Sequence, residues 1–172
     1  MKLIFLDIDG VLNHELWFKE RFNSLKKSHG DEKFFDPKSV GLLNFILSET
    51  DAKIVVSSSW RLGRSVDDLK EIFSKVGVDP SLIIDKTPML SFQDLKINNQ
   101  EYHYSVPRGC EIKAWMECNK NILGDKISKV RYIILDDDSD MLFWQRNNYL
   151  QVDSYCGLTY NLAHKAIQIL NR

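Results

Sequence analysis

The chain has 172 residues, of which 44% are hydrophobic and 27% are charged, and its formal net charge is −1. This length suits one domain with a substantial core, and the charge excludes a protein whose main affinity comes from a broad basic surface. The apolar run from Leu3 to Leu6 is too short for a signal peptide, and no segment approaches the roughly 20 apolar residues of a membrane span. We therefore expect a single cytoplasmic domain over residues 1–172, without a membrane partner.

The chain alternates short apolar runs with amphipathic segments. Residues 3–6 form a continuous apolar run, which predicts a strand buried on both faces. Asp36 followed by Pro37 is typical of a helix N-cap and first helical position, so a helix is expected to begin there. The β-branched run 53–56 predicts a second strand. By the same patterns, helices are expected over residues 65–76, 111–118 and 158–170, and strands over residues 82–84, 132–135 and 149–152.

This alternation predicts an α/β fold of the Rossmann-like, doubly wound type, with a mainly parallel sheet and helices on both faces. Two stretches interrupt the pattern, at about residues 13–35 and 85–107, and the second is expected to be a loop or small hairpin. Both are too short for a full cap domain, so we expect only small cap insertions. Because the carboxyl ends of parallel strands share one edge of a sheet, polar residues that follow different strands are expected to meet there.

Two acids follow the first predicted strand. Asp7 and Asp9 are separated by one residue, and Gly10 allows the chain to turn sharply after them. The carboxylate of Asp7 can attack phosphorus, while that of Asp9 can protonate the leaving oxygen and then activate water. Two acids so close also repel each other unless a cation lies between them. The alternative is a plain turn at the strand end, with Asp9 and Gly10 as its turn residues.

A second acidic group, formed by Asp136, Asp137, Asp138 and Asp140, follows a later predicted strand. Four carboxylates within five residues are costly without a cation, and Mg²⁺ prefers a few carboxylates together with water and phosphate oxygens. We therefore expect Asp136 and Asp137 to bind Mg²⁺ together with Asp7. The alternative, a solvated acidic loop that caps the next helix, suits Asp138 and Asp140 better.

The run from Ser57 to Arg61 lies at the end of the second predicted strand. Hydroxyl and backbone N–H groups in this position can hold phosphate oxygens as charge develops, and Arg61 can pair with phosphate through two hydrogen bonds. Ser57 is the first candidate, and Ser58 is the alternative because a strand end can shift by one residue. The competing interpretation is a polar turn with Trp60 in the core and Arg61 in a surface ion pair.

A cation is needed to balance the charges of the nucleophile and the phosphate. Arg108 lies just before a predicted helix, whose N-terminus would assist in binding an anion. Lys113, about one turn further along, is the competing candidate, although a solvated lysine is the simpler interpretation of that residue.

Taken together, these segments resemble the haloacid dehalogenase-like (HAD) hydrolase superfamily. The resemblance rests on D-x-D-G-V-L at residues 7–12, strands that end in Ser57 and in Asp136-Asp137, and a basic residue near position 108, in the family's order. A narrower resemblance is to the HAD domain of Swiss Army Knife RNA repair proteins, to which polynucleotide 3′-phosphatases are related. It rests on D-x-D-G-V-L-N, S-S-S-W-R, R-G-x-E-I-x-x-W at residues 108–115, L-D-D-D, and G-L-T at residues 157–159.

The resemblance implies a Mg²⁺-dependent phosphatase with Asp7 as the nucleophile and Asp9 as the general acid and base. Dehalogenases of the superfamily lack the second acid, so Asp9 favours phosphate esters as substrates. The family's basic residue is often lysine, which keeps both basic candidates open. The other implied ligands are Ser57 for phosphate, Arg108 or Lys113 for the basic role, and Asp7, the backbone carbonyl of Asp9, Asp136 and Asp137 for Mg²⁺.

Small insertions cannot close over a crevice, which favours a large substrate such as the 3′-phosphate end of RNA or DNA. Aromatic and basic residues of the first insertion can stack bases and track phosphates, or can instead form an amphipathic helix packed on the body. These residues are His14, Trp17, Phe18, Lys19, Arg21, Phe22, Lys26 and Lys27. Three functions stay open: a nucleic-acid end phosphatase, a phosphatase of small metabolites or nucleotides, and an inactive module that binds phosphorylated partners.

Overall fold

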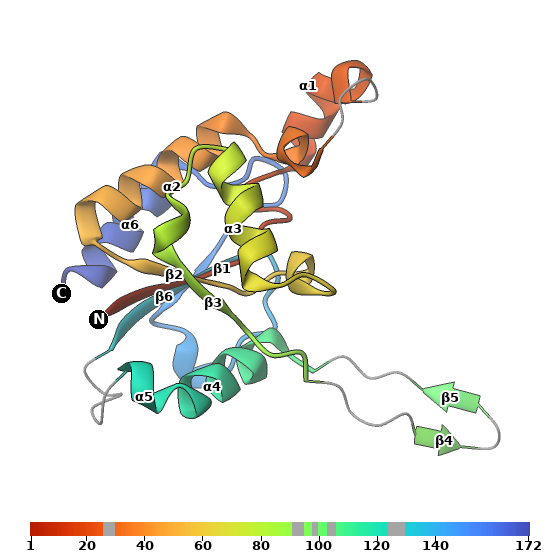
Figure 1. The fold of residues 1–172 in the computed structure, drawn as a ribbon, viewed down its shortest axis with the longest axis vertical. Helices are drawn as coiled ribbons and strands as arrows, with labels where there is room; N and C mark the ends of the chain where they lie inside the picture. The colour runs from red at the N-terminus through yellow and green to blue at the C-terminus, as the bar shows by residue number, and fades with distance from the viewer. Residues whose placement is uncertain (26–29, 91–94, 98–99, 103–105, 124–129) are drawn as a thin grey trace.

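A five-stranded parallel sheet forms the centre of the computed structural model, which describes residues 1–25, 30–90, 95–97, 100–102, 106–123 and 130–172 (Figure 1). The strand order is β3-β2-β1-β6-β7, and every pairing in this sheet is parallel. This confirms the predicted α/β fold. The strands are β1 (Lys2–Leu6), β2 (Lys53–Val56), β3 (Ile83–Lys86), β6 (Arg131–Asp136) and β7 (Tyr149–Gln151).

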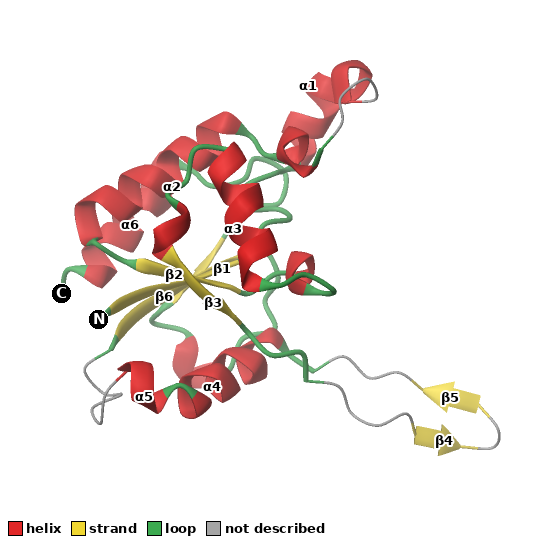
Figure 2. Ribbon diagram, in the orientation of Figure 1, coloured by secondary structure: helices red, strands yellow, loops and turns green. Residues whose placement is uncertain are grey.

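Helices cover both faces of the sheet (Figure 2). On one face lie α2 (Pro37–Thr50), α3 (Val66–Lys75) and α6 (Tyr160–Leu170), and on the other lie α4 (Arg108–Cys118) and α5 (Lys120–Leu123). A cluster of buried apolar side chains fills each interface: the larger includes Leu43 and Phe73, and the smaller packs Phe5 against Trp115. Short 3₁₀ helices are η1 (Asp31–Phe34), η2 (Ser59–Arg61), η3 (Pro80–Leu82) and η5 (Phe143–Gln145).

Local sequence signals begin two of these helices as predicted. The Asp36 side chain accepts hydrogen bonds from the backbone N–H groups of Lys38 and Ser39, with Pro37 in the first turn of α2. Ser65 and Asp68 form a reciprocal capping box at the start of α3. These caps satisfy backbone donors that would otherwise lack partners at the helix ends.

The carboxyl ends of the three central strands, β2, β1 and β6, are paired with one another. Leu6 of β1 is paired with Val56 of β2 on one side and with Leu135 of β6 on the other. The chain runs from β1 outward to β2 and β3, and then returns to place β6 on the opposite side of β1. The sheet therefore reverses its order beside β1, and ligands of such sheets bind at that point.

Several boundaries differ from the expected ones. The last helix begins at Tyr160 because Thr159 is its N-cap, so Leu158 is buried outside the helix. Helix α4 begins three residues earlier than expected, at Arg108. The short strand expected over residues 82–84 is shifted to Ile83–Lys86.

Both insertions contain secondary structure. The first holds α1 (Glu15–Leu25) and η1. The second holds the antiparallel pair β4 (Leu95–Ile97) and β5 (Gln100–Tyr102), which agrees with the small hairpin, one of the two structures expected there. Figure 1 shows this pair away from the central sheet. Lys26 and Lys27, named among the aromatic and basic residues of the first insertion, lie outside the described residues. Within the described part of the chain, every helix is too short or too polar to cross a bilayer.

Candidate active site

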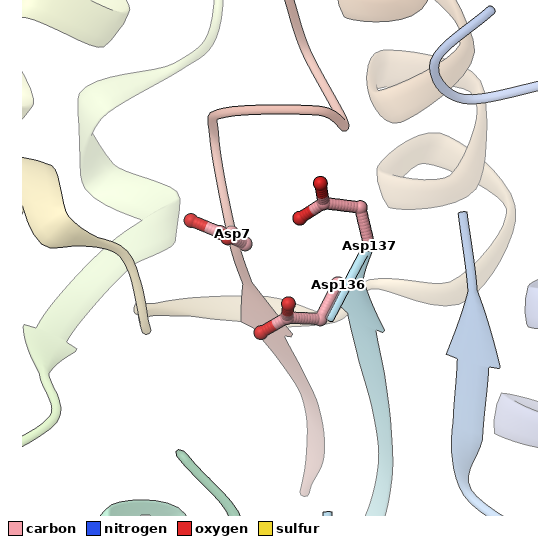
Figure 3. Close-up of side chains that lie close together, drawn as sticks. All are labelled: Asp7, Asp136 and Asp137. Carbon is pink, nitrogen blue, oxygen red and sulfur yellow. The ribbon is translucent and has the colours of Figure 1, made fainter. Parts of the chain in front are cut away.

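Three carboxylates meet at the carboxyl edge of the sheet. Asp7 directly follows β1, Asp136 ends β6, and Asp137 is the next residue. One carboxylate oxygen from each lies within 4.8 Å of the others, and Figure 3 shows the three side chains facing a shared space. The level ends of β1 and β6 explain this meeting, because the backbone N–H of Asp7 donates to the carbonyl of Leu135 at 2.9 Å. The structure thus brings together the acids that the sequence placed far apart.

Burial, with a smaller contribution from neighbouring acids, disfavours the ionised form of each of the three acids. Burial raises the pKa of Asp7 to about 6, although a hydrogen bond from Ser58 and the positive charge of Arg108 act in the opposite direction. Burial, followed by the negative charge of Asp7, raises the pKa of Asp136 to about 8. Burial also raises the pKa of Asp137. Carboxyl groups with these properties are stabilised as anions by a cation among them.

This donor set fits Mg²⁺. The ion prefers oxygen ligands from a few carboxylates and leaves other positions for water and phosphate. Oδ2 of Asp136 is buried and accepts no hydrogen bond from the described residues, so it is available to a cation. The backbone also makes room at this point. Gly10 has a φ of +74°, and a Cβ atom there would lie 2.3 Å from Oδ2 of Asp137, so only glycine lets this acid approach.

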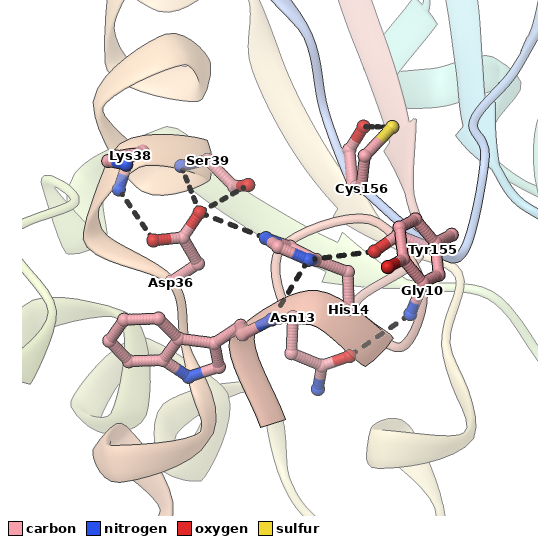
Figure 4. A network of polar contacts seen from close by, with 10 residues as sticks. Gly10, Asn13, His14, Asp36, Lys38, Ser39, Tyr155 and Cys156 are labelled. Carbon is pink, nitrogen blue, oxygen red and sulfur yellow. Dashed lines mark hydrogen bonds and ion pairs between the residues drawn. The ribbon is translucent and has the colours of Figure 1, made fainter. Parts of the chain in front are cut away.

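Asp9 is exposed, and its side chain is not part of the three-acid group. Its Oδ1 accepts hydrogen bonds from Nδ2 of Asn13 at 2.8 Å and from Nε1 of Trp60 at 3.0 Å. Its Oδ2 accepts from the hydroxyl of Ser59 at 3.2 Å. Asn13 also fixes the turn, because its Oδ1 accepts from the backbone N–H of Gly10 (Figure 4). The carboxylate is therefore held in one orientation beside the three-acid group.

The serines after β2 occupy two different environments. Ser57 is fully buried, and its hydroxyl has no hydrogen-bond partner among the described residues. The hydroxyl of Ser58 is hydrogen-bonded to Asp7 and accepts from the backbone N–H of Trp60. The guanidinium of Arg108 donates to the backbone carbonyl of Ser57 and acts electrostatically on Asp7. The hydroxyl of Ser57 thus retains hydrogen-bonding capacity, whereas that of Ser58 is already engaged.

Arg61 is buried and bonded entirely to protein groups. Its Nη2 lies 2.5 Å from Oε2 of Glu111, and its Nη1 and Nε donate to the carbonyls of Ser58 and Thr87 at 2.7 and 3.1 Å. The ion pair is 6% exposed on each side, so the surface ion pair considered as the alternative for Arg61 is wrong. Glu111 completes this junction by accepting from the backbone N–H of Leu90.

The junction yields a stability prediction. Glu111→Gln leaves the guanidinium of Arg61 buried without a full counter-charge, so we expect the free energy of unfolding to fall by about 3 kcal/mol. Urea denaturation followed by circular dichroism measures the change. Glu117→Gln on the same helix is the matched control, because Glu117 is exposed and lies 3.7 Å from Lys113. Its effect is expected to be negligible, and equal losses in the two variants would contradict the role given to Glu111.

The two basic candidates lie on different parts of α4. Arg108 is its first residue, next to the acids, and its backbone N–H donates to Oδ2 of Asp140 at 2.7 Å. Lys113 is exposed, with its Nζ 5.7 Å from the ring centroid of Trp144, away from the three-acid group. The contact of Asp140 with the start of α4 agrees with an acid placed at a helix N-terminus. Asp138 is exposed, as a solvated loop requires.

Three of the aromatic and basic residues of the first insertion show different surroundings. His14 is buried, with its Nε2 3.1 Å from Asp36 and its Nδ1 3.2 Å from the carbonyl of Tyr155 (Figure 4). Phe18 contacts the ring of Phe34, and the guanidinium of Arg21 lies 4.6 Å from the ring centroid of Trp17. The contacts of His14 thus join the insertion to the body, whereas those of Phe18 and Arg21 lie within the insertion.

Sequence reasoning missed Asn13, Glu111 and the polar contact of Trp60. The sequence did contain a signal for Glu111. It lies beside Ile112 on the buried side of α4, and a charged side chain there requires a buried partner. The contacts of Asn13 and Trp60 with Asp9 had no comparable signal, since each depends on how a turn orients one side chain.

Comparison with known proteins gives one family match. The sequence model of one family, described as the HAD domain in Swiss Army Knife RNA repair proteins, matches residues 3–163. This span runs from β1 into α6 and includes every candidate site residue named above. No curated protein and no solved structure shows a significant match.

Proposed function

Because the chain belongs to the family of HAD domains in Swiss Army Knife RNA repair proteins, which suggests a phosphatase-type hydrolase, we propose that it hydrolyses phosphate monoesters with Mg²⁺ through an aspartyl phosphate on Asp7. The observation that carries this proposal is the meeting of Asp7, Asp136 and Asp137 at the carboxyl edge of the sheet. A purely structural acidic loop does not need carboxylates from two distant segments within 4.8 Å of one another.

The metal would be held by the carboxylates of Asp7, Asp136 and Asp137 and by the backbone carbonyl of Asp9. When bound, Mg²⁺ neutralises this cluster and the charge of the phosphoryl group. An oxygen of Asp7 attacks phosphorus, the bond from phosphorus to the leaving oxygen breaks, and Asp9 gives that oxygen a proton. In the second half, water gives a proton to Asp9 and attacks phosphorus, which releases phosphate and restores Asp7.

The phosphoryl oxygens would be bound by Ser57 and Arg108. The unpartnered hydroxyl of Ser57 supports its assignment, and Ser58 is the weaker candidate because it already contacts Asp7. The position of Arg108 beside the acids supports it over Lys113. Arg61 is a weak phosphate ligand because its guanidinium is already bonded to Glu111 and to backbone carbonyls.

The substrate we favour is a nucleic-acid end that carries a 3′-phosphate. The description of the matching family, which places the domain in RNA repair proteins, supports this choice. The small size of both insertions supports it too, because a chain end needs an open site. A small metabolite or nucleotide is the second candidate, and an inactive module that binds phosphorylated partners is the third.

Phosphate release from three substrates separates these functions. The protein is incubated with Mg²⁺ or with EDTA, and with a 3′-phosphorylated oligonucleotide, a set of mononucleotides, or an aryl phosphate. We expect Mg²⁺-dependent release from the aryl phosphate and, with a higher kcat/KM, from the oligonucleotide. Preference for mononucleotides would move the assignment to a metabolite phosphatase, and no release from any substrate would favour the inactive module.

A further inference from the structure

Trp60 makes a side-chain hydrogen bond to Asp9 in addition to its packing contacts. Its indole N–H points at Oδ1 of Asp9 at 3.0 Å, and Asn13 donates to the same oxygen at 2.8 Å. Among the described residues, Oδ2 of Asp9 receives only the hydroxyl of Ser59, at the longer distance of 3.2 Å. We propose that Trp60 is a positioning residue that orients Asp9 and directs its transferable proton to Oδ2. This inference rests on the proposed phosphatase function.

The chemistry of the donors makes the two oxygens of Asp9 unequal. An indole N–H and an amide NH₂ can only donate hydrogen bonds, whereas a hydroxyl can either donate or accept. The amide nitrogen of Asn13 faces Asp9 because its oxygen accepts from the N–H of Gly10. Oδ1 therefore has no place for a proton. When Asp9 is protonated, the proton lies on Oδ2, and the hydroxyl of Ser59 can turn to accept it.

The first insertion holds the indole in place. The ring of Trp60 meets Phe35 edge-on at 5.2 Å and Phe34 at 6.3 Å, measured between ring centroids. The guanidinium of Arg64 lies 5.4 Å from the same ring and donates to the carbonyl of Trp60. Asp31 fixes Arg64 through an ion pair at 3.0 Å. These contacts restrict the ring, and the N–H is therefore aimed at Asp9 before any substrate arrives.

The consequence concerns the first chemical step. As the bond from phosphorus to the leaving oxygen breaks, its electron pair moves to that oxygen, which takes the proton from Oδ2 of Asp9. An alkoxide needs this proton, whereas a dinitrophenolate is stable without it. Loss of the Trp60 contact should therefore slow cleavage of an alkyl phosphate far more than cleavage of 2,4-dinitrophenyl phosphate.

Trp60→Phe tests this difference, because it removes the N–H and keeps an aromatic ring against Phe35. The measurement is kcat/KM, which reports the steps through departure of the leaving group. We expect a loss of about 10- to 100-fold with an alkyl phosphate, since a hydrogen bond to a charged group contributes about 1.5–3 kcal/mol. With 2,4-dinitrophenyl phosphate we expect a change of less than about 2-fold. Asp9→Asn should show the same dependence on the leaving group.

Trp144→Phe is the matched control, since it makes the same substitution at an indole that is 59% exposed on η5. It should leave both substrates unaffected. Equal losses of Trp60→Phe on the two substrates would assign Trp60 to packing and overturn the inference, and so would the absence of any loss. A wild-type protein inactive on both substrates would instead overturn the proposed function, and the role of Trp60 with it.

The contact itself has a readout that needs no turnover. The chain has four tryptophans, so ¹⁵N-labelled protein should give four indole N–H signals, and the one missing from Trp60→Phe identifies Trp60. Asp9→Ala should move that signal upfield, as expected for a lost hydrogen bond to a carboxylate. An unmoved signal would show that the indole does not contact Asp9 and would overturn the inference even in an active enzyme.

Discussion

Asp7→Asn is expected to abolish phosphate release and, without metal, to make the protein more stable. The amide cannot form the acyl phosphate, so kcat should fall by at least about 10⁴-fold, in the range seen when a nucleophile is removed. Phosphate release from the aryl phosphate with Mg²⁺ measures the loss. Asp138→Asn is the control, because Asp138 is exposed in the same acidic run, and it should retain activity. Activity retained by Asp7→Asn would disprove Asp7 as the nucleophile.

The gain in stability follows from the raised pKa of Asp7. At pH 8 in EDTA the carboxylate is ionised, although burial disfavours its charge, and asparagine removes that cost. We expect a gain of about 1–3 kcal/mol, which corresponds to a rise in Tm of roughly 2–4 °C per kcal/mol for a chain of this size. Thermal denaturation measures it. A lower Tm than wild type would contradict a cost for burying the charge of Asp7, and an equal rise in Asp138→Asn would show that the gain is not specific to Asp7.

The metal-free protein is expected to lose stability as the pH rises from 5 to 8. Asp7 and Asp136 have folded pKa values of about 6 and about 8, above their unfolded values, so the folded state binds more protons than the unfolded state. The stability that these protons contribute is fully present below about pH 4 and is lost as the pH rises through the folded pKa values. For Asp7 alone the full loss, counted from below pH 4, is on the order of 3 kcal/mol, of which roughly half falls between pH 5 and pH 8.

Mg²⁺ should reverse this trend. The ion binds the deprotonated carboxylates, so it should raise the free energy of unfolding more at pH 8 than at pH 5. Urea denaturation at both pH values, with EDTA or with Mg²⁺, measures the four free energies. The double variant Asp136→Asn, Asp137→Asn should weaken the dependence on both pH and metal. Equal stabilisation by Mg²⁺ at the two pH values would argue against binding at this cluster.

The strand ends could be predicted because each signal was local. The apolar run 3–6 marks a buried strand, and parallel pairing then brings Asp7, Ser57 and Asp136 to one edge whatever the details of the loops. The caps at Asp36 and Ser65 were equally local, since each contacts backbone groups within three residues. Patterns of this kind determine the fold and the position of the acids.

The sequence alone could not decide which basic residue faces the acids. Arg108 and Lys113 lie five residues apart on α4, which at 100° per residue separates them by about 140° around the helix. Only the orientation of the packed helix decides which one faces the acids. The sequence likewise does not show that Arg61 is engaged, because its partner, Glu111, is 50 residues away. Contacts of this range leave no periodic pattern in a single sequence.

The junction of Arg61 and Glu111 also separates the second insertion from the catalytic edge. Arg61 fixes the chain at Thr87, and Glu111 fixes it at Leu90, both among the first residues of the insertion, while α4 begins at Arg108, just after it. The first residues of the insertion thus have an anchored base. Because the entropy of closing a loop grows only slowly with its length, such a base can carry loops of different size. A change in the length of this loop therefore leaves the acids in place at the edge of the sheet.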